Sequence, residues 1–171
     1  PKPGWVPTTQ TDEDQKAYAV YVQDQIDLGP HWKALVGVRY DRSKQSFNNL
    51  LRDLIIRQEP SATSPRVGLV YQPNEQWSFY ATTAKSFRPN TGISAPDVNG
   101  DSFSFDPEQG KSYEVGAKWD TGRVSSTFAV YQIEKENVLS PDPADPNNYN
   151  QAIGAMESKG VVLDVSGQIA P

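Results

Sequence analysis

The chain has 171 residues, of which 36% are hydrophobic and 22% charged, a size and composition that suit one ordinary domain. The mean hydropathy is −0.64, and no apolar run approaches the ~18 residues that a transmembrane helix requires, so a helical membrane protein is excluded. A membrane β-barrel stays compatible with these values, because its strands alternate lipid-facing and lumen-facing residues. The formal charge of −5 argues against nucleic acid as a partner, and the absence of cysteine excludes disulfides and thiolate metal sites.

Apolar and polar residues alternate with a period of two along most of the chain, which predicts β-strands. The alternation is cleanest from Trp32 to Tyr40. It is ambiguous after Arg123, where Phe128 and Val130 compete with their neighbours for the apolar face, so the faces of that strand stay unassigned. The predicted strands, in chain order, are Lys16–Leu28, Trp32–Asp41, Arg66–Gln72, Trp77–Thr82, Ser112–Trp119, Arg123–Val138 and Ser158–Ser166.

The connections between these strands alternate between short and long. Short turns, rich in glycine, proline, asparagine and aspartate, are predicted at Gly29-Pro30, Pro73-Asn74-Glu75 and Asp120-Thr121-Gly122. Long polar connections are predicted at Ser43–Thr63, Phe87–Pro107 and Val138–Ala152. Short turns at one end of a sheet and long loops at the other are typical of outer-membrane barrels.

Aromatic residues gather beside the predicted short turns. An amphipathic ring suits the head-group layer of a membrane, where its body meets hydrocarbon and its N–H or O–H meets water. We therefore expect a girdle at the membrane interface that consists of Trp32, Tyr71, Trp77 and Trp119. The alternative from the pattern alone is a soluble sandwich or a lipocalin-like barrel with the same aromatics in its core.

The sequence offers little for catalysis or for direct metal binding. His31 is the single histidine, so neither a histidine metal cluster nor a Ser-His-Asp triad has a second histidine in reserve. Glu134 and Glu136 alternate onto one strand face beside Lys135, and we interpret them as a solvated strand end that emerges from the membrane. We expect a protein that is not an enzyme and that has no metal site of its own.

Several stretches, by their order and spacing, resemble the TonB-dependent siderophore receptors, close to the ferrichrome and hydroxamate-siderophore type. They are Tyr21–Gln25, Gly37–Asp41, Ser64–Pro73, Ser78–Tyr80, Ser86–Pro89, Pro107–Lys118 and Ser158–Val161. The resemblance covers nearly the whole chain. It implies an all-β fold, namely an antiparallel up-and-down transmembrane β-barrel of about 22 strands, of which this chain supplies about seven.

The resemblance also implies a location and a function. Residues 1–171 are expected to be a partial barrel domain, without the family's plug domain, TonB box and C-terminal strands. The receptor is expected in the outer membrane of a Gram-negative bacterium, in contact with lipid, where it takes up a ferric siderophore. TonB-ExbB-ExbD supplies the energy through the plug. Iron is carried inside the siderophore, so no cofactor is expected, and haem, cobalamin or an oligosaccharide stay open as other substrates.

The resemblance implies two groups of site residues. The lumen-facing polar group, which either contacts the plug or is simply solvated, is Arg39, Asp41, Arg66, Glu114 and Lys118. The group expected to bind the siderophore by stacking, cation–π contacts and hydrogen bonds, with loop packing as the alternative, is Phe87, Arg88, Phe103, Phe105 and Tyr149. One departure is Val162, where the family pattern usually has glutamate, which puts the hydrogen bond of that carboxylate in doubt.

Overall fold

The computed structural model describes residues 10–51, 53–89, 106–140, 151–153 and 155–168. The strands are β1 (Thr11–Asp27), β2 (Trp32–Asn49), β3 (Leu54–Gln58), β4 (Ser61–Tyr71), β5 (Trp77–Arg88), β6 (Glu108–Asp120), β7 (Val124–Glu136), β8 (Val138–Ser140), β9 (Gln151–Ile153) and β10 (Met156–Gly167). None of the described residues belongs to a helix of the length and apolarity needed to cross a membrane.

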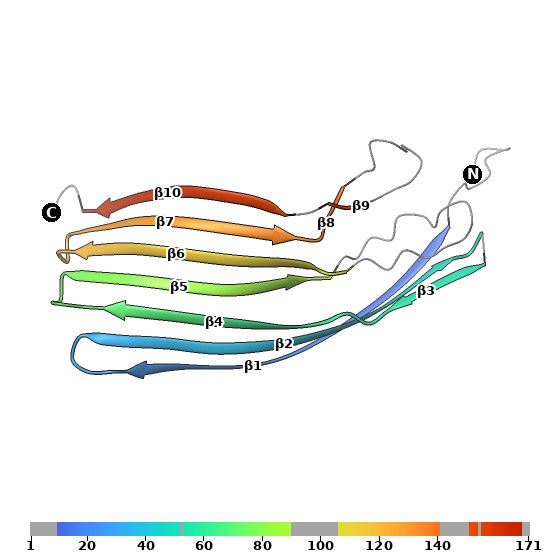
Figure 1. Ribbon diagram of the computed structural model, residues 1–171, viewed down its shortest axis with the longest axis horizontal. Helices are drawn as coiled ribbons and strands as arrows, with labels where there is room; N and C mark the ends of the chain where they lie inside the picture. Colours follow the sequence, from blue (N-terminus) through green and yellow to red (C-terminus); the bar gives the residue numbers. More distant parts are fainter. Residues whose placement is uncertain (1–9, 52, 90–105, 141–150, 154, 169–171) are drawn as a thin grey trace.

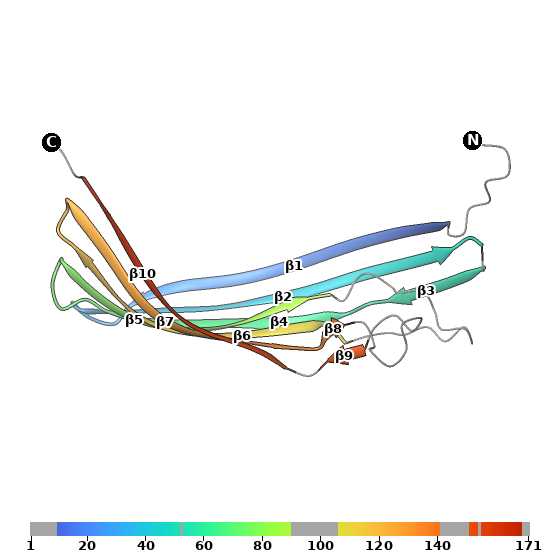
Figure 2. The same cartoon turned by 90° about the horizontal axis from the view of Figure 1, so that it is seen from above.

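Seven long strands form one antiparallel sheet in the order β1-β2-β4-β5-β6-β7-β10. β3 also pairs with β2, beyond the end of β4, while β8 and β9 form a separate two-stranded sheet. Figure 1 shows the tight turns at one end of the sheet and the hairpin of β2 and β3 at the other. Figure 2 shows that the sheet is twisted and curved. The prediction of an all-β, antiparallel up-and-down sheet with about seven long strands is confirmed.

The predicted long polar connection Ser43–Thr63 consists largely of strand, because β2 and β3 form a β-hairpin there and β4 begins at Ser61. β2 continues far past its predicted end, the chain turns at Asp53 with a φ of 50° that aspartate tolerates, and β3 returns along β2. The Gln45 side chain ties three strands together, because it donates to Glu13 of β1 and accepts from Gln58 of β3 at 2.9 Å. This hairpin and the first half of β1 extend beyond the ends of the other strands (Figures 1 and 2).

The other connections differ in how far the structure describes them. The three short turns are confirmed, and in one of them the Asn74 side chain accepts the backbone N–H groups of Gln76 at 3.0 Å and Trp77 at 2.9 Å. β5 continues to Arg88, so the start of the second predicted connection is strand instead. Most of the second and third predicted connections, residues 90–105 and 141–150, lies outside the described residues.

The strand register assigns the faces that the sequence left open in β7. Val130 lies opposite both Val115 of β6 and Val161 of β10, so Phe128 and Val130 share the face of those valines. Tyr131 consequently lies on the opposite face. The predicted faces of the other long strands agree with this register.

The sheet is a single layer without an interior core. Among the described residues Ala129 is the one apolar side chain that is buried, at 4% exposure. Large apolar side chains such as Val36, Leu69 and Val115 are exposed. A soluble sandwich would bury them against a second sheet, and the described residues form no second sheet against this face. So large an exposed apolar surface marks contact with another protein part or with a membrane.

Candidate functional site

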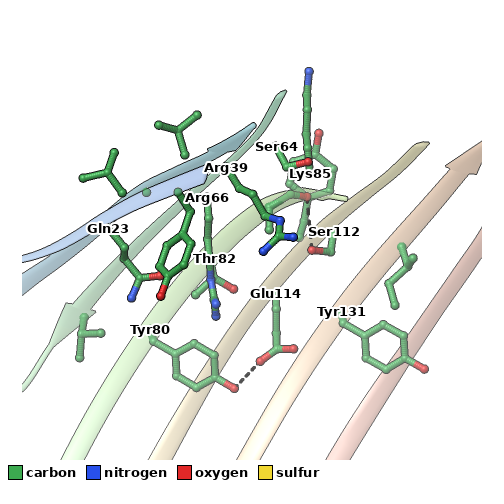
Figure 3. Close-up of a pocket in the computed structure, with 18 of the residues that line it drawn as sticks. Gln23, Arg39, Ser64, Arg66, Tyr80, Thr82, Lys85, Ser112, Glu114 and Tyr131 are labelled. Atoms are coloured by element: carbon green, nitrogen blue, oxygen red, sulfur yellow. Dashed lines mark hydrogen bonds between the residues drawn. The ribbon is translucent and has the colours of Figure 1, made fainter. Parts of the chain in front are cut away.

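The two faces of the sheet differ in chemistry. We call the face that carries Arg39, Arg66 and Glu114 the inner face, and the face that carries Val36 and Val115 the outer face. A hollow of about 1000 Å³ lies on the inner face, with lining residues from β1, β2, β4, β5, β6, β7 and β10. Figure 3 shows side chains that line it.

Tyr80, Glu114 and Lys118 form a contact group in the hollow. The phenol O–H of Tyr80 donates to Oε1 of Glu114 over 2.7 Å, which is the dashed line between them in Figure 3. The Lys118 Nζ lies 5.6 Å from the centre of the Tyr80 ring, within the range of a cation–π contact. A hydrogen bond to a charged acceptor contributes about 1.5–3 kcal/mol. The Glu114 carboxylate is therefore oriented by a side chain of the neighbouring strand.

Two tyrosine rings on the inner face lie directly over glycines of the next strand. A Cβ on Gly116 would lie 2.5 Å from Cζ of Tyr80, and a Cβ on Gly160 would lie 2.5 Å from the hydroxyl oxygen of Tyr131. Real Cβ atoms do not approach other atoms so closely, so these rings need glycine beneath them. Each ring thus lies close to the backbone, and the inner wall stays flat at these points.

The two arginines of the hollow differ in their partners. Arg39 Nε donates to both carboxylate oxygens of Asp41 at 2.9 Å, and its Nη2 lies 2.8 Å from Oδ1. Arg66 has no ion pair and no side-chain hydrogen bond with the other described residues, and the small residues Gly37 and Ala84 flank it in register. Its guanidinium group is therefore open to a partner from outside the sheet.

The predicted lumen-facing residues all share the inner face: Arg39, Asp41, Arg66, Glu114 and Lys118. Their contact with a plug stays a prediction. Val162 also lines the hollow, at the place where the family pattern has glutamate. Sequence reasoning missed Tyr80 and Tyr131, because only the register shows which residue of the next strand lies under each ring.

On the outer face the boundary between apolar and charged residues shifts from strand to strand. On β10 this boundary lies at Lys159. Following the paired residues from strand to strand, through β7, β6, β5, β4 and β2, leads from Lys159 to Asp24 on β1. On β1, where Asp24 alone interrupts the apolar face, the boundary lies at Lys16, eight residues farther from the turns.

This shift measures the tilt of the strands against the apolar band. Eight residues over six strand-to-strand steps is roughly 1.3 residues per step, or ~4.4 Å along a strand for each ~4.8 Å across the sheet. The corresponding tilt is about 40°, and strands of membrane barrels tilt by roughly 35–45°. The outer face is therefore an apolar band of the kind that tilted strands present to a flat membrane.

The four aromatic residues predicted for the membrane interface lie on the outer face at the turn end. The ring centres of Trp32 and Tyr71 are 4.6 Å apart, and those of Trp77 and Trp119 are 6.2 Å apart. Phe79 stacks on Trp77 at 5.8 Å. The rings thus form two contact groups beside the short turns, and their role at a membrane interface stays a prediction.

The residues predicted to bind the siderophore are only partly described. Phe87 and Arg88 end β5, and strand alternation places Phe87 on the outer face and Arg88 on the inner face. Of these two, Arg88 alone points to the side of the hollow. The remaining three, Phe103, Phe105 and Tyr149, lie outside the described residues.

The structure shows no arrangement suited to direct metal ligation within its described residues. No group of three or more histidine, cysteine, aspartate and glutamate side chains there could hold a metal ion. His31 forms a hydrogen bond between its Nδ1 and the backbone carbonyl oxygen of Gln72 at 2.9 Å, which fixes the ring in the turn region.

Comparison with known proteins places this sheet in a family. Residues 1–169 match the family model described as TonB dependent receptor-like, beta-barrel. The metal-pseudopaline receptor CntO of Pseudomonas aeruginosa is 38% identical over 99% of this chain, which covers 24% of that receptor. The ferrioxamine B receptor of Salmonella typhimurium is 31% identical over 88% of this chain and 20% of that receptor.

A solved structure gives the same result. The alcaligin outer-membrane receptor FauA of Bordetella pertussis superimposes with a TM-score of 0.72 and 26% identity, over 94% of this chain and 28% of that one. The chain spans about a quarter of the length of these relatives. It belongs to the β-barrel domain family of the TonB-dependent receptors, outer-membrane proteins of Gram-negative bacteria.

Proposed function

We propose that this chain is part of the barrel wall of a receptor that takes up a ferric siderophore, with energy delivered by TonB-ExbB-ExbD through a plug domain. The observation that carries the proposal is the two-faced wall. Its outer face is an apolar band crossed by strands at about 40°. Its inner face is a hollow lined by side chains of seven strands, six of which contribute charged or aromatic residues.

The chemistry of the inner face suits a transport receptor that recognises the outside of a metal complex. The siderophore itself holds Fe³⁺, so the protein needs hydrogen-bond donors and aromatic surfaces and no metal ligands. Arg66 offers an unpaired guanidinium group, and Tyr80 and Tyr131 offer flat rings. In the whole receptor the plug shares this lumen, and we assign Arg39, Glu114 and Lys118 to contacts with it.

A second cargo is favoured by one specific observation. The relative that is 38% identical over 99% of this chain is a receptor for metal-pseudopaline. The ferrioxamine B receptor, in contrast, is 31% identical over 88% of the chain. A metal carried by pseudopaline is therefore the second candidate substrate, and it leaves the proposed route and energy source unchanged.

Growth tests with the full-length receptor decide among these substrates. The receptor is expressed in a Gram-negative strain that lacks its own siderophore receptors, and iron-limited medium is supplemented with ferrichrome, ferrioxamine B, iron-loaded pseudopaline or haem. Cobalamin, which carries cobalt, is tested separately as the required vitamin of a cobalamin-dependent strain. We expect iron-limited growth on at least one siderophore or on iron-loaded pseudopaline, and only with functional TonB. Growth with haem or cobalamin alone, or growth without TonB, contradicts the proposal.

A matched pair of variants tests the inner face at the loop end. Arg88→Gln removes a cation on the side of the hollow, while Arg123→Gln removes one in a tight turn at the opposite end. We expect the first to weaken siderophore binding by about tenfold, as for one lost charged hydrogen bond, and the second to leave it unchanged. Equal effects of both variants contradict the placement of the ligand at the loop end.

A further inference from the structure

The inner face carries a surplus of positive charge between the level of Arg66 and the loop end of β5. Four cations and two carboxylates occupy the described strand positions there, although the whole chain has a formal charge of −5. They are Arg39, Arg66, Arg88 and Lys135, with Asp41 and Glu108. This part of the wall is therefore locally basic in an acidic chain.

The two carboxylates already have cationic partners. The pairs are Arg39–Asp41 at 2.8 Å and Lys135–Glu108 at 3.0 Å. Glu108 lies opposite Arg88 in the strand register, but its carboxylate contacts the lysine instead. Within the described residues neither Arg66 nor Arg88 has an ion pair, and both side chains are exposed. The surplus charge thus belongs to these two guanidinium groups.

The surface between the two arginines is open. The ladder between β4 and β5 ends at the pair Arg66–Ala84, and Pro65, the next residue of β4, has no amide hydrogen with which to extend it. Figure 1 shows the two strands separating from there toward the loop end. The inner-face residues of this stretch are small, namely Ala62, Ser64, Ala84 and Ser86. No bulky inner-face side chain of these two strands therefore stands between Arg66 and Arg88.

The two arginines lie at different depths of the wall. Arg88 ends β5, and Arg66 lies four residues deeper on the neighbouring strand, which is a Cα separation of roughly 14 Å. Arg66 lines the hollow, and Figure 3 shows Gln23 and Thr82 on either side of it. The amide and the hydroxyl group add hydrogen-bond donors to the guanidinium group. A ligand that enters from the loop end meets one guanidinium group at the mouth and a second one below it.

We propose that this part of the inner face selects metal complexes that carry free carboxylate groups, which bind to Arg88 and to Arg66. The inference rests on the proposed function and names its substrate class, an anionic complex in place of a neutral or cationic hydroxamate complex. A guanidinium group donates two parallel hydrogen bonds to a carboxylate, and none of the described wall carboxylates occupies these two. The surplus charge also attracts an anion toward the loop end before contact.

The test uses iron complexes that share one hydroxamate cage and differ in the charge of the tail. Ferrioxamine B ends in an ammonium group, its N-acetyl derivative in a neutral amide and its N-succinyl derivative in a carboxylate. Quenching of tryptophan fluorescence gives the Kd of each complex for the full-length receptor. We expect the succinyl complex to bind about tenfold more tightly than the acetyl complex, as for one charged hydrogen bond, and the ammonium complex to bind least tightly. Added salt should reduce these differences.

Substitutions assign the preference to the two arginines. The receptor with both Arg66→Gln and Arg88→Gln should bind the succinyl and acetyl complexes equally. The receptor with both Arg66→Lys and Arg88→Lys should keep part of the preference, because the charges remain and the parallel hydrogen bonds are lost. Arg42→Gln is the matched control, since it removes an arginine at the same end on the outer face, and it should keep the full preference. Heat-dependent mobility in gels verifies that each variant is folded.

Three results overturn the proposal. One is equal affinity of the unsubstituted receptor for the three complexes, or no binding of the succinyl complex at all. Another is a preference that persists in the double glutamine variant, which indicates that both arginines contact the plug or solvent. The third is an equal loss in Arg42→Gln. TonB-dependent growth on a siderophore does not depend on these outcomes, so failure of the carboxylate proposal leaves the transport proposal standing.

Discussion

Replacement of Gly116 by alanine tests whether the flat tyrosine on the inner wall has an energetic role. The new Cβ would lie 2.5 Å from Cζ and 2.6 Å from the hydroxyl oxygen of Tyr80, so the ring must move. A displaced ring loses its 2.7 Å hydrogen bond to Glu114, a loss of about 1.5–3 kcal/mol. Alanine also has fewer accessible conformations than glycine in the unfolded chain, which stabilises the folded state by about 0.4–1 kcal/mol. The expected net destabilisation is about 1–2 kcal/mol.

The assay is equilibrium unfolding of the full-length receptor by urea in lipid vesicles, followed by tryptophan fluorescence. A double-mutant cycle isolates the contact between the ring and the glycine. In a Tyr80→Ala background, Gly116→Ala should cost nothing and should stabilise slightly. Gly68→Ala is the control on the same face, since its nearest neighbour, Cγ2 of Thr82, lies at 3.3 Å and has only to yield slightly. An equal cost of Gly116→Ala in both backgrounds refutes the reasoning.

Four further predictions address the outer face, the hairpin, the orientation and the metal. Val36→Arg should destabilise the receptor by roughly 2–4 kcal/mol if the residue faces lipid, whereas Val36→Leu should cost less than about 1 kcal/mol; a larger cost for leucine in urea unfolding means that protein packs there. The hydrogen bond from Arg42 lowers the pKa of Glu59 below its ordinary value of 4.5, so this contact stabilises the hairpin above that pH and is lost as pH falls through the lowered pKa. The protection factors of the hairpin amides, which correct for the intrinsic pH dependence of exchange, should fall over that range, and Glu59→Gln should abolish this change. A cysteine at Leu51 should react with an impermeant maleimide on intact cells, and one at Asn74 should not; the reverse pattern inverts the orientation. Bare Fe³⁺ should not bind to the purified receptor in equilibrium dialysis, and stoichiometric tight binding contradicts the absence of protein ligands.

The strands that the sequence predicts correctly are those in which one face contacts an apolar environment and the other contacts water. Trp32–Tyr40 is such a case, and the structure follows it residue by residue. The hairpin made by β2 and β3 escaped prediction because its apolar residues, Phe47 in β2 and the run Leu54–Ile56 in β3, do not alternate with polar ones, so the period of two that identifies a strand is absent. The signal that remained was a set of glutamine and glutamate residues, and their cross-strand hydrogen bonds appear only with the register.

The candidate site also has some features that the sequence predicts and others that need the register between strands. The placement of Arg39, Arg66 and Glu114 on one face follows from a period of two, which a single strand carries by itself. The ring of Tyr80 over Gly116 depends on two strands separated by a long connection, and a single sequence does not give their relative register. The faces of β7 needed the same information, because Phe128 and Ala129 both fit an apolar position.

The step of the apolar boundary by a little more than one residue per strand has a consequence for how such a wall changes in evolution. The offset averages roughly 1.3 residues per step over the seven long strands, so a hairpin of two strands contributes on average roughly two to three residues of offset and is a self-contained unit of the wall. A gene duplication that adds one hairpin, or a deletion that removes one, advances the boundary by the same offset on every following strand. The new wall therefore meets the membrane at the same level, with a wider or narrower circumference, and only the loops have to adapt to a changed lumen.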